Sequence, residues 1–181
     1  GQIHCSILKD ELEDAAEQLN MLSVFNETIT RSPEIAYLEA LLSWQQDKNR
    51  GKSEKLLGET VHLHLKQLKG AMIKDVFAHF IYLNPTFLAQ VSRQYLNFNG
   101  SEPMDSSETL PHSLSTAVKI MERTIHKAPG FVEGLLVLGT AKFLSNTCED
   151  AADTVTRALE VCPKLTSAHL LYSQISLHSR N

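Results

Sequence analysis

The chain has 181 residues, of which 43% are hydrophobic and 21% are charged, and its formal net charge is −4 at pH 7. This composition is typical of an ordinary globular chain with enough apolar residues for one continuous core. The slightly negative charge argues against a nucleic-acid surface, and no apolar run approaches the roughly eighteen residues that a membrane-spanning helix requires. Three cysteines without metal-ligand spacing, Cys5, Cys148 and Cys162, favour a reducing compartment.

The first part of the chain carries one helical pattern and then a pair of them. A helix expected over residues 10–31 resembles the second half of a helix-turn-helix repeat whose first half is missing. A complete repeat is expected over residues 34–66, with its second helix at 53–65. Large and small side chains recur at helical spacing along its first helix: Tyr37, Ala40, Leu41 and Trp44.

Residues 69–83 interrupt this pattern. Gly70 is expected to stop a helix, and the stretch 75–83 is apolar enough to be buried. An isolated strand would leave its backbone groups unpaired in a stack of helices. We therefore expect a short extra helix or an irregular wedge here.

A second complete repeat is expected over residues 85–127. Pro85 suits the first turn of a helix, because the N–H that proline lacks has no helical partner there. Large and small residues follow at the repeat positions, in the first helix at Leu88, Val91, Ser92 and Tyr95 and in the second at Ala117, Met121 and Thr124. The connection 99–112 is about thirteen residues longer than the repeat allows, and it is acidic and rich in turn formers, which predicts an exposed, mobile loop.

The stretch 131–163 matches the tetratricopeptide repeat best. Pro129 and Pro163 lie 34 residues apart, which is the length of that repeat. The first helix places Leu135, Leu138, Gly139 and Lys142 at positions that call for two large residues, a tiny one and usually an aromatic, and the second places Ala151, Val155 and Ala158 at positions that call for small, bulky and small residues. Small side chains allow the two helices to cross closely. Lys142 alone departs from the pattern.

A further first helix is expected over residues 166–178, with His169, Tyr172 and Ser173 at the same positions. The recurring pattern predicts an all-α fold. We expect tetratricopeptide-type helix-turn-helix repeats stacked as a right-handed α-solenoid, in one continuous segment over residues 1–181.

Catalysis finds little support in the sequence. His62 and His64 are two residues apart, so their rings point to different faces of a helix and cannot form a helical metal pair. The acidic run 11–14 is typical of a helix start, where carboxylates meet the helix dipole favourably. Phosphate-loop, nucleophile-elbow and zinc-peptidase motifs are absent from the sequence. We expect no enzyme activity, no metal site and no cofactor.

Several pieces carry a family resemblance beyond the generic repeat residues. They are the stretches 14–19, 37–42, 83–88, 95–98 and 167–171, together with Gln174. On these residues the chain resembles a middle portion of the tetratricopeptide repeat subunit of intraflagellar transport complex A, the ciliary tetratricopeptide repeat protein 21 family. Residues 71–81 fit that family poorly, which leaves a divergent paralogue or a shortened product open.

The resemblance implies a scaffold that holds neighbouring subunits of a transport train. The implied partners are other subunits of intraflagellar transport complex A, the implied process is retrograde ciliary transport and cilium assembly, and the implied location is the cytoplasm, the cilium and the ciliary base. Direct membrane insertion is not expected.

Stacked hairpins offer a long concave wall for protein contacts. We expect the following residues to project from first helices into that groove: Arg93, Asn97, Glu133, Thr140, Phe143, Gln174 and His178. The alternative is an adaptor that captures a short peptide or chaperone tail there. A clamp for a terminal carboxylate needs several converging basic and amide residues, and only Arg93 and Asn97 qualify.

The last helix predicts a second contact surface. Its apolar stripe includes Leu171, Tyr172 and Ile175, and only one preceding hairpin is available to cover it. An exposed apolar stripe normally marks an interface. We therefore expect these residues to be exposed, and the chain either to continue or to self-associate through this helix.

Overall fold

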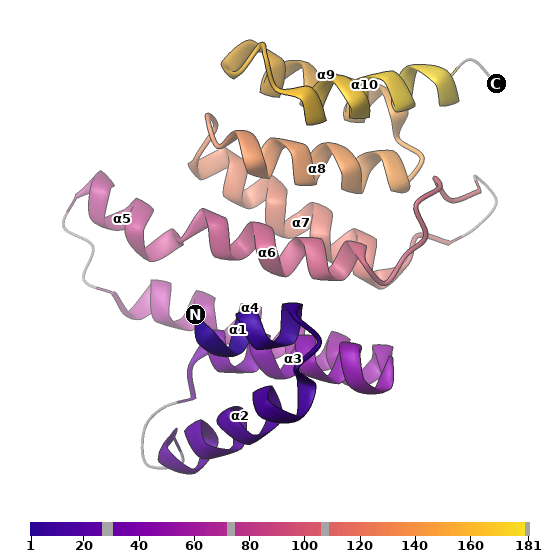
Figure 1. The fold of residues 1–181 in the computed structure, drawn as a ribbon. Helices are drawn as coiled ribbons and strands as arrows, with labels where there is room; N and C mark the ends of the chain where they lie inside the picture. Colours follow the sequence, from indigo (N-terminus) through magenta and orange to yellow (C-terminus); the bar gives the residue numbers. More distant parts are fainter. Residues whose placement is uncertain (27–30, 72–74, 106–108, 180–181) are drawn as a thin grey trace. The chain divides into compact units, whose positions relative to one another are not determined.

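A computed structural model describes residues 1–26, 31–71, 75–105 and 109–179 of the chain, and all regular secondary structure in these residues is helical (Figure 1). The helices are α1 (Gln2–Leu8), α2 (Leu12–Asn26), α3 (Pro33–Asp47), α4 (Arg50–Gly70), α5 (Val76–Leu83), α6 (Pro85–Leu96), α7 (His112–Lys127), α8 (Val132–Leu144), α9 (Cys148–Val161) and α10 (Thr166–His178). The predicted all-α class of paired helices is confirmed. No helix in these ranges is long and apolar enough to cross a bilayer.

The chain divides into two compact units, Gly1–Met72 and Ile73–Asn181. The division falls within the stretch 69–83 that the sequence marks as an interruption of the repeats. Each unit is therefore a stack of helices in its own right, and the single continuous array over residues 1–181 stays a prediction.

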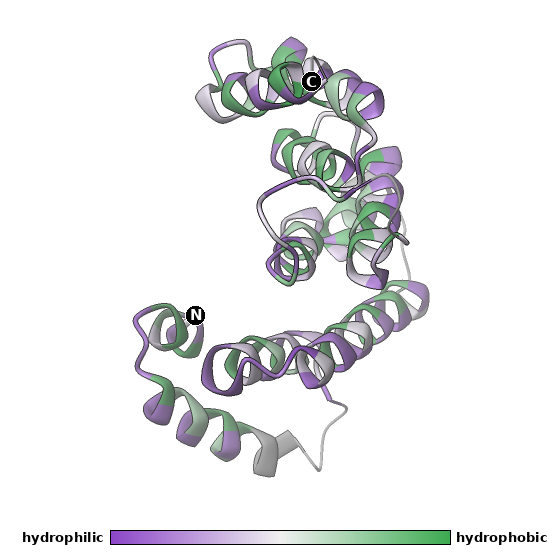
Figure 2. Ribbon diagram, turned by 90° about the vertical axis from the view of Figure 1, so that its right-hand side faces the viewer, coloured by the Kyte–Doolittle hydropathy of each residue, from purple (hydrophilic) through white to green (hydrophobic). Residues whose placement is uncertain are grey.

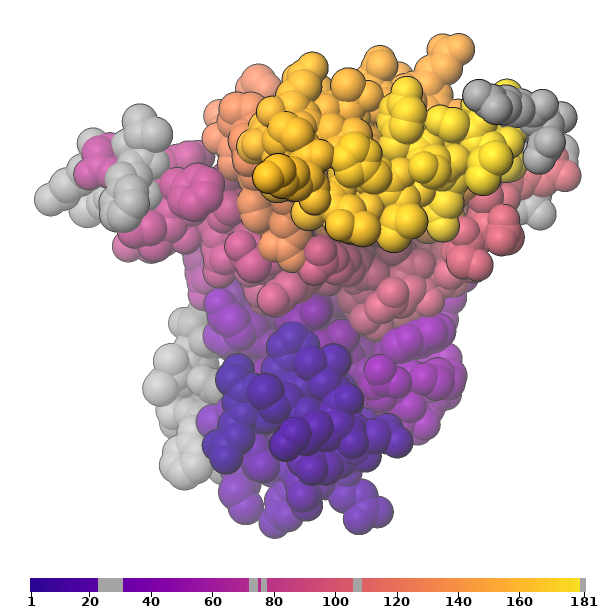
Figure 3. Space-filling model, turned by 45° about the horizontal axis from the view of Figure 1, so that its top comes forward, coloured from indigo at the N-terminus to yellow at the C-terminus, as the bar shows by residue number. Residues whose placement is uncertain are grey.

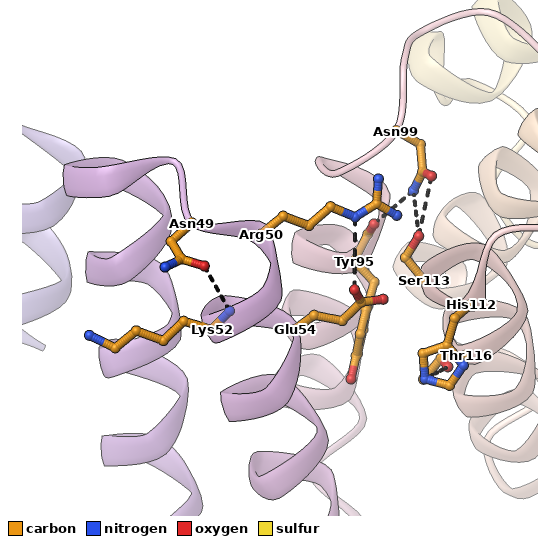
Figure 4. A network of polar contacts seen from close by, with 9 residues as sticks. All are labelled: Asn49, Arg50, Lys52, Glu54, Tyr95, Asn99, His112, Ser113 and Thr116. Atoms are coloured by element: carbon orange, nitrogen blue, oxygen red, sulfur yellow. Dashed lines mark hydrogen bonds and ion pairs between the residues drawn. The ribbon is translucent and has the colours of Figure 1, made fainter.

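The first unit is built around the hairpin of α3 and α4. Ser32 and Asn49 start these helices, because their side chains accept hydrogen bonds from the backbone N–H groups of Ile35 and Lys52, the second of which is drawn in Figure 4. Ser53 has no exposed surface and donates from Oγ to the carbonyl oxygen of Ala40 at 2.8 Å. Small residues thus bring the two helices together, as the repeat pattern predicts.

The sequence pattern did not predict α1. This seven-residue helix packs against α2 and α3 through the buried side chains of Ile3 and Ile7. The ring of His4 also meets Tyr37 of α3 edge-on, with ring centroids 6.0 Å apart. A first helix therefore precedes the stretch in which we expected only half a repeat.

Asn84 joins α5 to α6 in the second unit. Its φ of 43° lies in the left-handed region, which asparagine tolerates better than most residues and which ends α5 sharply. Its Oδ1 accepts a hydrogen bond from the N–H of Phe87, so the same residue caps α6, and Pro85 occupies the first turn. Of the two forms expected for residues 75–83, the structure shows the helix, and it projects from the end of α6 (Figure 1). The burial expected for this apolar stretch is wrong for Phe80, Ile81 and Tyr82, which are 47%, 58% and 49% exposed.

The second unit stacks the hairpins α6–α7 and α8–α9 and then α10. Each helix contacts the next, and the first helices also contact one another, α6 with α8 and α8 with α10. Figure 2 shows hydrophilic and hydrophobic residues interspersed along the helices. The buried residues of α7 and α9 recur at helical spacing and form one face towards the core, whereas α8 is buried on most of its sides. The largest fully buried side chains of this unit include Val91, Tyr95, Leu114, Met121, Leu135 and Val155.

The connection between α6 and α7 is anchored at both ends of its described part. Asn99 Nδ2 donates to the carbonyl oxygen of Tyr95 at 3.0 Å and to Ser113 Oγ at 3.1 Å, which ties the loop to both helices (Figure 4). The N–H of Met104 donates to the carbonyl oxygen of Leu144 at the end of α8, at 3.0 Å. We expected an exposed, mobile loop. Ser101 and Asp105 are exposed, as expected. The start of the loop is nevertheless attached to α6, α7 and α8, and two of these bonds go to carbonyl groups that helix ends leave free to accept them. Residues 106–108 lie outside the described part.

Candidate functional site

A groove runs along the second unit between the first helices of its repeats. It has a volume of about 620 Å³ and is lined by residues of α6, α8 and α10 together with Ser101 of the loop. We call it the α6–α8–α10 groove. Five of the residues predicted to project into such a groove line it: Arg93, Asn97, Thr140, Phe143 and Gln174.

The two remaining predicted groove residues lie against members of this set. Glu133 Oε1 is 2.6 Å from Nη1 of Arg93, which joins α8 to α6 by an ion pair. The ring of His178 meets Phe143 edge-on, with ring centroids 5.8 Å apart. The structure therefore places five of the seven predicted residues in the groove lining and the other two in contact with members of that set.

Polar groups in the groove are largely engaged within the protein. Arg93 is paired with Glu133, and Asn97 Nδ2 donates to Gln94 Oε1 at 3.1 Å. The hydroxyl of Thr140 donates to the carbonyl oxygen of its own helix at Leu136, at 2.9 Å. Arg93, Asn97 and Thr140 thus each use at least one donor within the protein.

Much of the groove lining is apolar, and this part was missed by the sequence analysis. Leu136, Val137, Leu144, Leu170 and Leu171 all line it, and Leu170 is 62% exposed. Leu170 stands four residues before Gln174 and therefore shares its helix face. That spacing is the signal in the sequence that places Leu170 in the groove.

The exposure expected for two residues of α10 is wrong. Leu171 and Ile175 are 8% and 2% exposed and belong to a core cluster with Phe143, Ala151, Val155 and Ala168. They are four residues apart, so both point towards the preceding hairpin, which is enough to cover them. Tyr172 is 42% exposed as expected, and Leu177 is 66% exposed. In the view of Figure 3, the yellow atoms of α10 lie uncovered.

Metal-ligating side chains do not cluster in the described part of the chain. No three histidine, cysteine or acidic residues gather there in a way that could hold a metal ion. Cys5, Cys148 and Cys162 are free thiols.

The sequence profile of the tetratricopeptide repeat protein 21 second ARM domain matches residues 1–180. Tetratricopeptide repeat protein 21A of Mus musculus is 32% identical over 181 residues, which cover 100% of this chain and 14% of that protein. Tetratricopeptide repeat protein 21B of Xenopus laevis is 33% identical over 175 residues (97% and 13%), and that of Homo sapiens is 29% identical over 177 residues (98% and 13%).

The chain thus spans about one seventh of the length of these relatives. The match to the domain profile extends over both compact units. From this match and the helical hairpins that it covers, we conclude that the chain belongs to the tetratricopeptide repeat protein 21 family.

Proposed function

We propose that this chain is a non-catalytic protein–protein interaction scaffold and that the α6–α8–α10 groove is one of its contact surfaces. The observation that supports the proposal is that five of the seven predicted contact residues line one groove between three first helices, and the other two contact members of that set. A wall of this kind offers an extended surface and no enclosed reaction chamber.

The family suggests the setting. We propose that the chain is part of a subunit of intraflagellar transport complex A, that its partners are other subunits of that complex, and that it acts in retrograde ciliary transport and cilium assembly. On this proposal it resides in the cytoplasm, the cilium and the ciliary base. Because the chain spans only 13–14% of its relatives, it supplies one segment of such a scaffold.

The chemistry of the groove favours an apolar contact over an adaptor that clamps a terminal carboxylate. Arg93 and Asn97 are the two residues best placed for a clamp, and both already have partners within the protein. Leu170 and Leu136 instead present apolar surface that a partner helix or loop can cover. Burial of such surface is worth roughly 25 cal/mol per Å².

Two variants of α10 test this proposal with a matched pair of substitutions. Leu170 lines the groove and Leu177 does not, yet the two leucines are similarly exposed, at 62% and 66%. Tagged chains carrying Leu170→Asp or Leu177→Asp are used to recover intraflagellar transport subunits from extracts of ciliated cells. We expect L170D to lower recovery at least about tenfold, as desolvation of a charge in a contact would do, and L177D to leave it unchanged.

Equal recovery by both variants would place the contact outside the groove. If the parent chain is folded by circular dichroism and recovers none of these subunits, the assignment to the complex fails for this segment. Binding measured between the chain and purified subunits tests the groove and the assignment to the complex separately. The groove proposal predicts that L170D weakens binding to any partner with an apolar contact surface, whichever complex that partner belongs to.

A further inference from the structure

Lys142 departs from the repeat pattern, since its position usually takes an aromatic residue. The structure shows what surrounds its ammonium group. The side chain is half-buried, and Nζ lies 3.4 Å from Thr154 Oγ1, which itself donates to the carbonyl oxygen of Asp150. No carboxylate within the described ranges forms an ion pair with Lys142. A partly desolvated ammonium group with one weak neutral contact is poorly compensated.

Lys142 lines a hollow of about 430 Å³ between α7, α8 and α9, which we call the α7–α9 hollow. Arg157 of α9 and His126 of α7 line the same hollow. Among the ion pairs of the described residues, Arg157 takes part in none, in contrast to Arg93, which is paired with Glu133. Glu122 is the only carboxylate lining the hollow, and it pairs with neither cation in the part of the chain described. Two permanent cations therefore face a single acid.

The remaining walls of the hollow are apolar. Ile125, Pro129 and Leu138 supply them, from the end of α7, the following turn and α8. Leu138 and Lys142 are four residues apart and share one face of α8, whereas Thr140 lies on the opposite face and lines the groove. The hollow and the α6–α8–α10 groove thus open on different sides of the same helix.

We propose that the α7–α9 hollow is a second binding site and that it receives the carboxylate of an acidic peptide segment of a protein partner. The ligand carboxylate binds Lys142 Nζ and the Arg157 guanidinium, and its aliphatic stem packs on Leu138 and Pro129. Charge-assisted hydrogen bonds of this kind are about twice as strong as neutral ones.

Fluorescence anisotropy of a fluorescein-labelled hexaglutamate peptide, with hexaglutamine as the neutral comparison, tests the site on the 181-residue chain. We expect the parent chain to bind hexaglutamate, and Lys142→Met and Arg157→Gln each to weaken binding about tenfold. Lys164→Met removes an exposed positive charge outside the hollow and should change binding less than about twofold. Lys142→Arg retains the charge and should preserve most of the affinity.

The outcomes are distinguishable. Undetectable binding of hexaglutamate by the folded parent chain overturns the proposal, as does equal weakening by K142M, R157Q and K164M. Binding of a phosphoserine peptide without binding of hexaglutamate would make the hollow a phosphate site and would also overturn it. If K142M fails to fold by circular dichroism, the exposed Arg157 variant still decides the question.

Discussion

Gly139 of α8 and Val155 of α9 lie so close that a β-carbon built on the glycine would be 2.7 Å from Cγ2 of the valine. Val155 has no exposed surface, and its β-branched side chain is stiff, so it cannot swing away cheaply. We expect Gly139→Val to lower the free energy of unfolding by about 1–3 kcal/mol, the usual cost of overpacking a core. Chemical denaturation followed by circular dichroism measures this.

Gly130 provides the control for that substitution. It lies in the turn before α8, and a β-carbon there would meet nothing within 4 Å. Gly130→Val should therefore change the free energy of unfolding by less than about 0.5 kcal/mol, as most surface changes do. Equal destabilisation by both variants would show that the close approach of α8 and α9 is not what requires Gly139.

Arg93 and Glu133 join α6 to α8 at the edge of the groove, with 2.6 Å between Nη1 and Oε1. The two side chains are 49% and 35% exposed, so water screens the pair. A double-mutant cycle with Arg93→Ala and Glu133→Ala should give a coupling free energy of only about 0.2–1 kcal/mol. A coupling near zero would mean that the pair does not persist in solution and that Arg93 is available to an acidic ligand.

The helix pattern of the second unit was predictable from sequence because its repeat positions carry strong local signals. Pro85, Pro129 and Pro163 mark helix boundaries, and the small residues Gly139 and Ala151 allow α8 and α9 to cross closely. The groove followed from the same register, since first-helix residues four apart share one face. Lys142 also departs from this register, and in the structure it lines the α7–α9 hollow.

The missed features depend on tertiary contacts that local patterns do not encode. Helix α1 is only seven residues long, and it is stabilised by packing of Ile3 and Ile7 and not by its own propensity. The burial of Leu171 depends on how deeply α10 docks against Phe143 and Val155. The bond from Met104 to Leu144 joins residues forty apart, a separation at which sequence reasoning has no signal.

His4 should make the docking of α1 sensitive to acid. Burial, together with the nearby amino-terminal charge, lowers the pKa of His4 below its ordinary value. The folded state therefore favours the neutral imidazole. The contribution of His4 to the free energy of unfolding is fully present above the ordinary histidine pKa, and it is lost as the pH falls from that value towards the lowered pKa of the folded state. Thermal unfolding at about pH 7.5 and about pH 5.5 should show a larger acid-induced loss for the parent chain than for His4→Phe, which keeps a ring but cannot titrate. Identical losses of thermal stability in the parent chain and in His4→Phe would show that His4 does not cause the sensitivity to acid.

The exposed residues of α10 make a last prediction about self-association. Tyr172 and Leu177 are exposed and do not line the groove, whereas Leu171 is buried in the core of the second unit. We expect the isolated chain to dimerise at tens of micromolar, because exposed apolar side chains favour association. We expect Tyr172→Ser with Leu177→Ser to make the chain monomeric without loss of stability. Light scattering across a concentration series measures both.

Leu171→Ala separates association from folding on the same helix. It removes buried methyl groups, so it should lower the free energy of unfolding by about 2–5 kcal/mol, and any change in its association would follow from the loss of the fold. The double variant with Tyr172→Ser and Leu177→Ser should instead keep the free energy of unfolding of the parent chain. Only the rise of its apparent mass with concentration should disappear. A parent chain that stays monomeric throughout the series would show that the two exposed side chains Tyr172 and Leu177 do not drive self-association.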